Sequence, residues 1–122
     1  MVSGIGIDVV ETTRLQQAID RWGDIFLKKI FTTGEIDYAR SKKNYIQHFA
    51  ARFAAKEAVA KALAKGWGSG FRWKDVEIEN DAAGKPSVIL HGHLKTVLQK
   101  KQVHVSISHS ENVVVAFAII EE

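Results

Sequence analysis

Hydrophobic and small or polar residues alternate at the start of the chain, in the stretch "GIGIDVV" at residues 4–10. A period of two is typical of a β-strand, whose side chains point to opposite faces in turn. The pattern therefore predicts a strand in which an aspartate shares a face with a glycine. One face carries Ile5, Ile7 and Val9, and the other carries Gly6, Asp8 and Val10.

Helical spacing follows. Apolar residues recur at intervals of three and four over 12–22, which predicts an amphipathic helix with a polar opposite face. A second, short helix is expected over 24–31. Thr32 and Glu35 have the spacing of a capping box, which starts a helix over 35–43.

Strand patterns dominate the second half of the chain. The segments 75–79 and 87–91 flank the turn sequence "NDAAGKP", and 103–108 and 113–120 flank "HSEN". Each pair predicts a hairpin. One more helix is expected between them, over 93–101.

The longest predicted helix runs from 44 to 65 and ends in the glycine-rich "KGWGSG". The order of elements, a strand, then helices, then a strand-rich half, predicts an α+β fold with helices packed on one face of a largely antiparallel sheet. With 122 residues, 46% of them hydrophobic, we expect a single domain over 1–122.

The amino-acid composition excludes several kinds of functional site and several classes of protein. Cysteine is absent, which excludes disulfides, thiolate metal sites and a cysteine nucleophile. No apolar run approaches about 18 residues, and the first residues lack a signal-peptide pattern, so we expect a cytoplasmic protein without a membrane span. The net charge of +3 suits an anionic partner, but no block of like charges indicates a nucleic-acid binder.

The longest helix sets charged side chains beside its apolar face. At roughly 100° per residue, Lys56 falls inside the apolar arc, and Glu57 and Lys61 fall at its margin. Buried ionised groups are costly unless they are paired, hydrogen-bonded or bound to a metal. The Lys56 stem could lie along apolar surface with its ammonium reaching solvent, or the ammonium could reach a partner or a cleft.

Asp8 and Glu57 each have two interpretations. Asp8 could be a hydrogen-bonded structural residue at a strand end, and Glu57 could form a helical ion pair with Lys61. If the fold brings them together, however, the two carboxylates make a plausible magnesium site, since this ion takes one or two protein carboxylates and fills its other positions with water and phosphate oxygens.

Two further stretches contain residues that could bind a ligand or take part in catalysis. In "HVSISHS" His104, Ser106 and Ser108 share one strand face, and His109 stands at the following turn. A serine hydrolase is disfavoured because no G-x-S-x-G elbow exists, and His109 is the residue best placed to meet a ligand. The "KGWGSG" stretch is either a helix stop or a phosphate cradle of backbone amides.

Five motifs, taken in order, resemble a known family. They are "GIGIDVVETTRL", "FTTGEIDYA", "HFAARFAAKEAVAKAL", "NDAAGKPSVILHG" and "HVSISHS". Together they cover nearly the whole chain and are similar to the holo-acyl carrier protein synthases, the small bacterial 4′-phosphopantetheinyl transferases. The most specific pair is "GID" and "FAAKEAVAK".

The resemblance implies a magnesium-dependent transferase of fatty acid biosynthesis. Its substrates are coenzyme A and apo-acyl carrier protein, whose serine receives the phosphopantetheine group while adenosine 3′,5′-bisphosphate is released. The resemblance also implies a homotrimer with its sites between subunits. One departure is the stretch "NVVVAF", where the family commonly has an aromatic residue shortly after the Ser-His pair.

The resemblance also assigns residues. Catalytic roles fall on Asp8, Glu57 and Lys61, with Asp8 and Glu57 as the magnesium ligands. The implied coenzyme A contacts are Lys56, Lys61, Gly66, Lys85, Pro86, His109 and Ser110. The implied carrier-protein contacts are Arg14 and Arg21, on the polar face of the first helix.

Two other functions stay open at this point. A non-catalytic module that binds an acidic partner through Arg14 and Arg21 leaves Asp8 and Glu57 unexplained. A metal-dependent hydrolase of nucleotide diphosphates uses the carboxylates but gives the basic helix no role.

Overall fold

The computed structural model describes residues 1–63 and 70–122. The first strand, β1 (Val2–Glu11), leads into α1 (Thr12–Ile30), α2 (Thr33–Arg40) and α3 (Tyr45–Ala62). After the segment that is not described come a 3₁₀ turn (Trp73–Asp75) and the strands β2 (Val76–Asn80) and β3 (Pro86–Leu90). The chain ends with α4 (Gly92–Val97), β4 (Gln102–His109) and β5 (Val113–Glu121).

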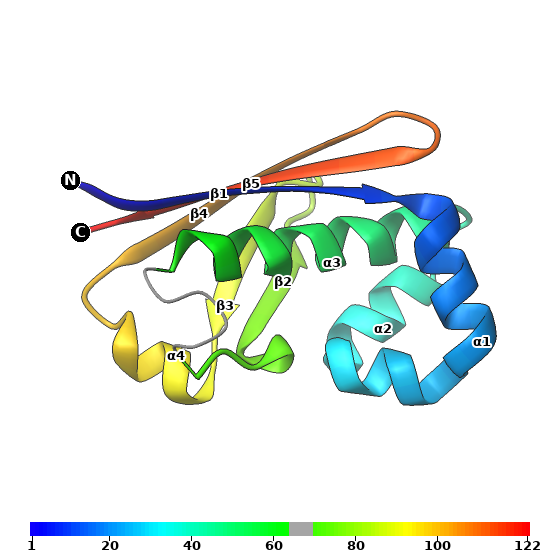
Figure 1. The fold of residues 1–122 in the computed structure, drawn as a ribbon, viewed down its shortest axis with the longest axis horizontal. Coiled ribbons are helices and arrows are strands. Elements are labelled where there is room, and N and C mark those ends of the chain that lie inside the picture. Colours follow the sequence, from blue (N-terminus) through cyan, green and yellow to red (C-terminus); the bar gives the residue numbers. More distant parts are fainter. Residues whose placement is uncertain (64–69) are drawn as a thin grey trace.

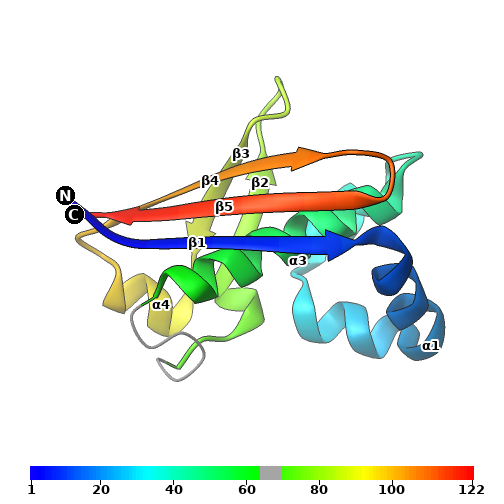
Figure 2. The same ribbon diagram turned by 45° about the horizontal axis from the view of Figure 1, so that its top comes forward.

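The strands form two antiparallel sheets. One has the order β1-β5-β4, and the other is the hairpin of β2 and β3. All four labelled helices lie on the same side of the three-stranded sheet, with α3 running along it (Figure 1). Figure 2 shows the three long strands side by side, with both chain termini at one end. The α+β class, the two hairpins and the one-sided packing of helices are thus confirmed.

The first strand packs against α3 through its glycines. A Cβ atom on Gly6 would overlap the carbonyl oxygen of Ala58, and one on Gly4 would overlap that of Ala62. Only glycine allows such a close approach of two backbones. The face of β1 that carries Gly6 and Asp8 therefore lies directly on α3.

The other face of β1 points away from the helices. Ile5, Ile7 and Val9 are 59%, 55% and 60% exposed. In the register of the sheet they stand beside Ile119, Phe117 and Val115 of β5, which are half-buried. The outer face of the sheet is therefore apolar over β1 and β5, and we call these six residues the outer apolar face.

The helix boundaries follow local chemistry. The structure joins the two predicted helices over 12–22 and 24–31 into α1, but Gly23 at φ 56° is not helical and bends the helix at the predicted break. The predicted capping box is present, since Glu35 N–H donates to Thr32 Oγ1 and Thr32 N–H donates to Glu35 Oε1. It starts α2 at Thr33, two residues before the predicted start.

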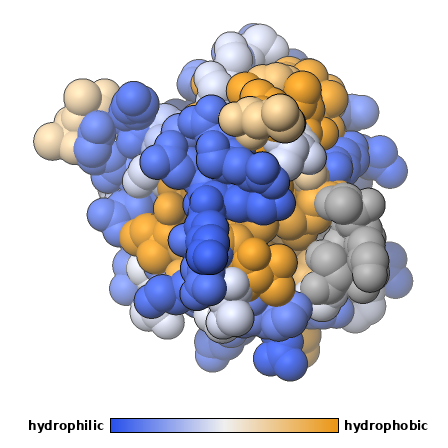
Figure 3. Space-filling view, turned by 90° about the vertical axis from the view of Figure 1, so that its left-hand side faces the viewer, coloured by the Kyte–Doolittle hydropathy of each residue, from blue (hydrophilic) through white to orange (hydrophobic). Residues whose placement is uncertain are grey.

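No helix among the described residues is both long and apolar enough to cross a membrane. Figure 3 views the end of the molecule that carries both chain termini, where apolar surface appears in patches between hydrophilic side chains. At this end an open groove between β3, α4 and β4 combines apolar and basic residues, among them Leu90, Lys95 and Lys101.

Candidate active site

Two carboxylates from distant parts of the sequence face one cavity. Asp8 of β1 and Glu57 of α3 both line an open cavity of about 580 Å³ between β1, α1 and α3, which we call the first cavity. Arg14 of α1 lies at the same cavity. The other lining residues are mostly apolar: Val9, Val10, Glu11, Leu15, Ala18, Phe26 and Phe53.

Asp8, Glu57 and Lys61 interact through their charges. The Nζ atom of Lys61 lies 3.0 Å from Oδ1 of Asp8 and also donates to the carbonyl oxygen of Ile7 at 3.2 Å. Burial raises the pKa of Glu57, the negative charge of Asp8 raises it further, and Lys61 opposes both. The helical ion pair between Glu57 and Lys61 was one of two interpretations of Glu57, and in the structure the ammonium of Lys61 reaches across to β1.

The donor set suits a hard cation. Two partly buried carboxylates from separate elements supply oxygen ligands to one open cavity. Within residues 1–63 and 70–122 no group of three or more His, Cys, Asp or Glu could hold a metal. The pair therefore fits an ion that takes its remaining ligands from water and substrate, as magnesium does, and does not fit a fully protein-enclosed metal site.

A second cavity, of about 220 Å³, lies beside the other flank of α3. It is lined by Pro86 of the predicted turn, by His109, and by His48 and Arg52 of α3. At about 100° per residue, the α3 residues of the two cavities lie on opposite sides of the helix. Within one chain the structure therefore separates the predicted set around Asp8 from the set around His109.

Arg52 is a residue that the sequence reasoning missed. Its side chain is 2% exposed, its Nη2 atom donates to Oδ1 of Asn80 at 2.7 Å, and its guanidinium lies 4.4 Å from the centre of the Tyr38 ring. Its Nε atom is buried and has no hydrogen-bond partner among residues 1–63 and 70–122. The spacing of four between His48 and Arg52 on the longest helix was the one available signal.

His48 is the other residue missed at the second cavity. Burial lowers its pKa, and the positive charges of Arg52, Lys42 and His109 lower it further. The residues that line this cavity thus include the cation Arg52 and the nitrogen-bearing side chains of His48 and His109, and charged and neutral N–H donors of this kind bind phosphate.

The remaining predicted residues of this set have simple surroundings. Lys85 is exposed, and its backbone N–H donates to Oδ1 of Asp81 at 2.9 Å. Ser110 is also exposed, and its backbone N–H donates to the carbonyl oxygen of Val113. Gly66 lies outside the described residues.

Comparison with known proteins identifies the family. The model of the 4′-phosphopantetheinyl transferase superfamily matches residues 4–118. The chain belongs to this superfamily. Among its relatives, a protein of Solibacter usitatus (strain Ellin6076) is 44% identical over 124 residues, covering 99% of both chains. One of Chlamydia trachomatis serovar L2 is 47% identical over 118 residues, covering 97% of this chain and 98% of the other. Both are named holo-[acyl-carrier-protein] synthase.

Solved structures with a similar fold carry the same name as these relatives. A holo-[acyl-carrier-protein] synthase from Neisseria meningitidis matches with a TM-score of 0.92 and 32% identity over the full length of both chains. One from Bacillus anthracis str. Ames, solved in complex with CoA (3′,5′-ADP), matches with a TM-score of 0.84 and 36% identity over 100% of this chain and 98% of the other.

One expected contact of this superfamily member does not hold. Lys56 was expected to contact coenzyme A, but its side chain is completely buried and its ammonium lies 2.8 Å from Oε1 of Glu35. The same ammonium donates to the backbone carbonyl oxygens of Trp73 and Val76. An ammonium has three donors, so Lys56 has none left for a ligand.

The basic helix of this superfamily member is exposed where the sequence predicted. Arg14 and Arg21 are exposed on α1, and the Arg21 guanidinium lies 5.0 Å from the centre of the Trp22 ring. Trp22 and Ile25 are 54% and 77% exposed. Helix α1 thus presents cations together with apolar surface next to the first cavity.

Proposed function

We propose that this chain transfers the 4′-phosphopantetheine group of coenzyme A to a serine of apo-acyl carrier protein and releases adenosine 3′,5′-bisphosphate. The observation that supports it most directly is the meeting of Asp8 and Glu57 at one cavity beside the basic helix α1. Family membership and the names of the relatives agree with it.

In this proposal Asp8 and Glu57 hold Mg²⁺. When bound, the ion would withdraw negative charge from the diphosphate of coenzyme A, which is the usual contribution of a metal to phosphoryl transfer. The pair offers two carboxylates and leaves the other coordination positions to water and phosphate.

The protein's own part is mainly positioning and charge. The serine oxygen of the carrier attacks the β-phosphorus, the bond from that phosphorus to the leaving bisphosphate breaks, and the serine proton passes to a base. Lys61, which forms an ion pair with Asp8, neutralises phosphate charge. The acceptor of the proton is either Glu57, whose pKa is raised, or a water molecule.

Coenzyme A is proposed to use the second cavity as well. Pro86, Lys85, His109 and Ser110 belong to this proposed set, together with Gly66 outside the described residues. The guanidinium of Arg52 at this cavity suits the phosphates of coenzyme A. Because the first and second cavities lie on opposite flanks of α3, we propose that one ligand reaches both only where two subunits meet.

A homotrimer accounts for this arrangement. In the outer apolar face Ile5, Ile7 and Val9 are each more than half exposed and lie next to one another, and contiguous exposed apolar patches often mark an interface. We propose that it lies between subunits and that Arg14 and Arg21 receive the acidic carrier protein. The proposal also retains a single domain over 1–122, a cytoplasmic location and a role in fatty acid biosynthesis.

Mass spectrometry tests the function directly. The protein, coenzyme A, Mg²⁺ and apo-acyl carrier protein are incubated together, and we expect the carrier to gain about 340 Da, the approximate mass of the transferred group. Carrier in which the acceptor serine is replaced by alanine is the control. Hydrolysis of coenzyme A without a mass gain would favour a diphosphate hydrolase, and binding without reaction would favour a non-catalytic module.

A further inference from the structure

Lys56 is the buried centre of a polar network. Its ammonium is held by the carboxylate of Glu35 and by the carbonyl oxygens of Trp73 and Val76, so all three of its N–H groups have acceptors. It also lies 5.8 Å from the centre of the Phe31 ring. A buried ammonium is tolerated only with such complete satisfaction.

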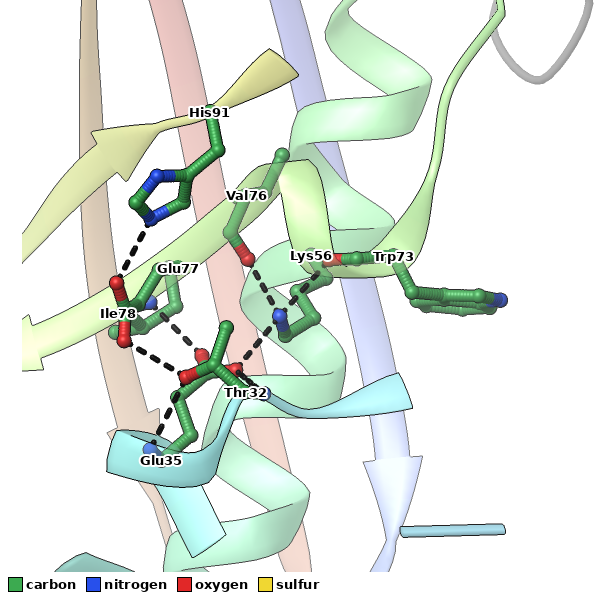
Figure 4. A network of polar contacts seen from close by, with 8 residues as sticks. All are labelled: Thr32, Glu35, Lys56, Trp73, Val76, Glu77, Ile78 and His91. Atoms are coloured by element: carbon green, nitrogen blue, oxygen red, sulfur yellow. Dashed lines mark hydrogen bonds and ion pairs between the residues drawn. The ribbon is translucent and has the colours of Figure 1, made fainter. Parts of the chain in front are cut away.

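Glu35 is equally engaged. Besides the ammonium of Lys56, its Oε1 accepts the backbone N–H of Thr32 at 2.9 Å, and its Oε2 accepts that of Ile78 at 2.8 Å. Figure 4 shows that these groups come from α2, α3, the 3₁₀ turn and β2. The carboxylate thus ties the start of α2 to the middle of α3 and to β2.

A second carboxylate extends the network to α4. Oε2 of Glu77 accepts the hydroxyl of Thr32 at 2.7 Å, and its Oε1 lies 2.8 Å from Nε2 of His91, the residue that precedes α4 (Figure 4). Lys56 thus joins three segments directly to α3, and His91 before α4 is connected to them through Glu77 and Thr32.

The position of Lys56 on α3 gives this network a consequence for the site. Glu57, the next residue, points about 100° around the helix from Lys56 and lines the first cavity. Arg52, one turn before Lys56 and on the same side of the helix as Lys56, lines the second cavity. A rotation of α3 that moved Glu57 out of the first cavity would break the buried contacts of Lys56. The network therefore fixes the direction in which both ligand-facing side chains point.

We propose that Lys56 is a positioning residue: its buried contacts with Glu35, Trp73 and Val76 fix the rotation and axial position of α3, and so hold Glu57 opposite Asp8. This inference rests on the proposed function. It differs from a contribution to stability alone, because it predicts a defect in metal binding and turnover in protein that is fully folded.

The test uses two variants and a control. Lys56→Met leaves Glu35 buried without its cation and endangers folding. The double variant Glu35→Gln/Lys56→Met removes both charges with little change in volume, keeps one acceptor oxygen at residue 35, and leaves no unpaired buried charge. Leu98→Ala is the control, because it opens a cavity at a residue that is 3% exposed and belongs to neither cavity of the site.

Three quantities are measured on protein that circular dichroism shows to be folded. They are kcat and KM for transfer, the affinity for Mn²⁺ from electron paramagnetic resonance, and hydrogen exchange of the α3 amides. For the double variant we expect kcat to fall by about 100-fold, the effect of a small displacement of a catalytic group. We expect Mn²⁺ affinity to fall about tenfold and α3 to exchange faster. Leu98→Ala should lower the unfolding midpoint and leave kcat and Mn²⁺ affinity unchanged.

A folded double variant with wild-type kcat and Mn²⁺ affinity would overturn the proposal. A failure of the proposed function looks different, because then the wild-type chain transfers nothing and Asp8→Asn does not alter Mn²⁺ binding. Even in that case hydrogen exchange decides: faster exchange over 53–61 in the double variant supports the anchoring of α3 by Lys56, and unchanged exchange contradicts it.

Discussion

At the scale of single residues, the first cavity depends on two negative charges held near each other. The charge of Asp8 contributes to the raised pKa of Glu57, and Lys61 offsets part of this repulsion. Such a pair is unfavourable for stability, since like charges disfavour the ionised state of each other. Its retention fits a role in ligand binding.

Removing one charge from this pair should separate function from folding. We expect Asp8→Asn and Glu57→Gln each to lower transfer by at least about 100-fold, the scale of losing one group that stabilises developing charge. The unfolding midpoint should stay the same or rise. Steady-state transfer at saturating Mg²⁺ and thermal unfolding are the measurements, with Glu79→Gln, an exposed carboxylate on β2, as the control. Near-normal turnover in either site variant would reject the metal assignment.

The charge of Arg14 offers a second residue-scale prediction. Arg14 is exposed on α1 beside the first cavity, so Arg14→Glu should repel an acidic carrier protein and raise its KM about tenfold or more, in line with the cost of opposed charges at an interface. The KM for coenzyme A should change little. Lys100→Glu, at an exposed position beyond α4, is the matched charge reversal. An unchanged carrier KM in Arg14→Glu would place the docking surface elsewhere.

At the scale of elements, the contact between β1 and α3 sets the geometry of the site. The two glycines of β1 let the strand lie on the helix backbone, and Asp8 follows Gly6 by two residues on the same face. On the α3 side the glycines face backbone atoms of Ala58 and Ala62, which are 0% and 5% exposed. The distance between the strand and the helix is therefore set by residues without large side chains.

An added methyl group at this contact should be costly. Gly6→Ala would place its Cβ against the backbone oxygen of Ala58, which cannot move aside as a flexible side chain can. We expect a loss of about 3 kcal/mol in the free energy of unfolding, at the upper end for overpacking, measured by urea denaturation. Gly34→Ala is the control, since the nearest atom there is the end of the Glu77 side chain at 3.2 Å. Equal stability of the two variants would show that β1 and α3 do not touch this closely.

The comparison of sequence and structure is clearest at this scale. Period and turn chemistry predicted the strands, the hairpins and the capping box, because these depend on nearby residues. Alternation in β1 predicted its two faces but not that the small face packs inward, which depends on the shape of α3. The helical angle of Lys56 was correct, yet its role was missed because its acceptors, Glu35, Trp73 and Val76, are distant in the chain. Arg52 was missed for the same reason, since its partner Asn80 lies in β2.

At the scale of the whole molecule, the outer apolar face predicts that copies of the chain associate with one another. We expect the wild-type protein to sediment at three times the 13.6 kDa of one chain. Ile7→Asp places a charge in the middle of this face, where burial of an unpaired carboxylate is unfavourable, and should shift the protein to monomer. Analytical ultracentrifugation measures this, with Lys100→Asp as the control. Transfer activity should fall with the trimer, and an active monomer would contradict a site shared between subunits.

The placement of the first and second cavities on opposite flanks of α3 has one more consequence. If every working centre combines the Asp8 side of one chain with the His109 side of its neighbour, then two defective chains can compensate for each other. Asp8→Asn and a variant lacking the His109 imidazole, each inactive alone, should regain part of the activity when they are unfolded together and refolded as a mixture. In a mixed trimer, some subunit interfaces combine the intact Asp8 of one variant with the intact His109 of the other. Such complementation cannot arise if every chain works by itself.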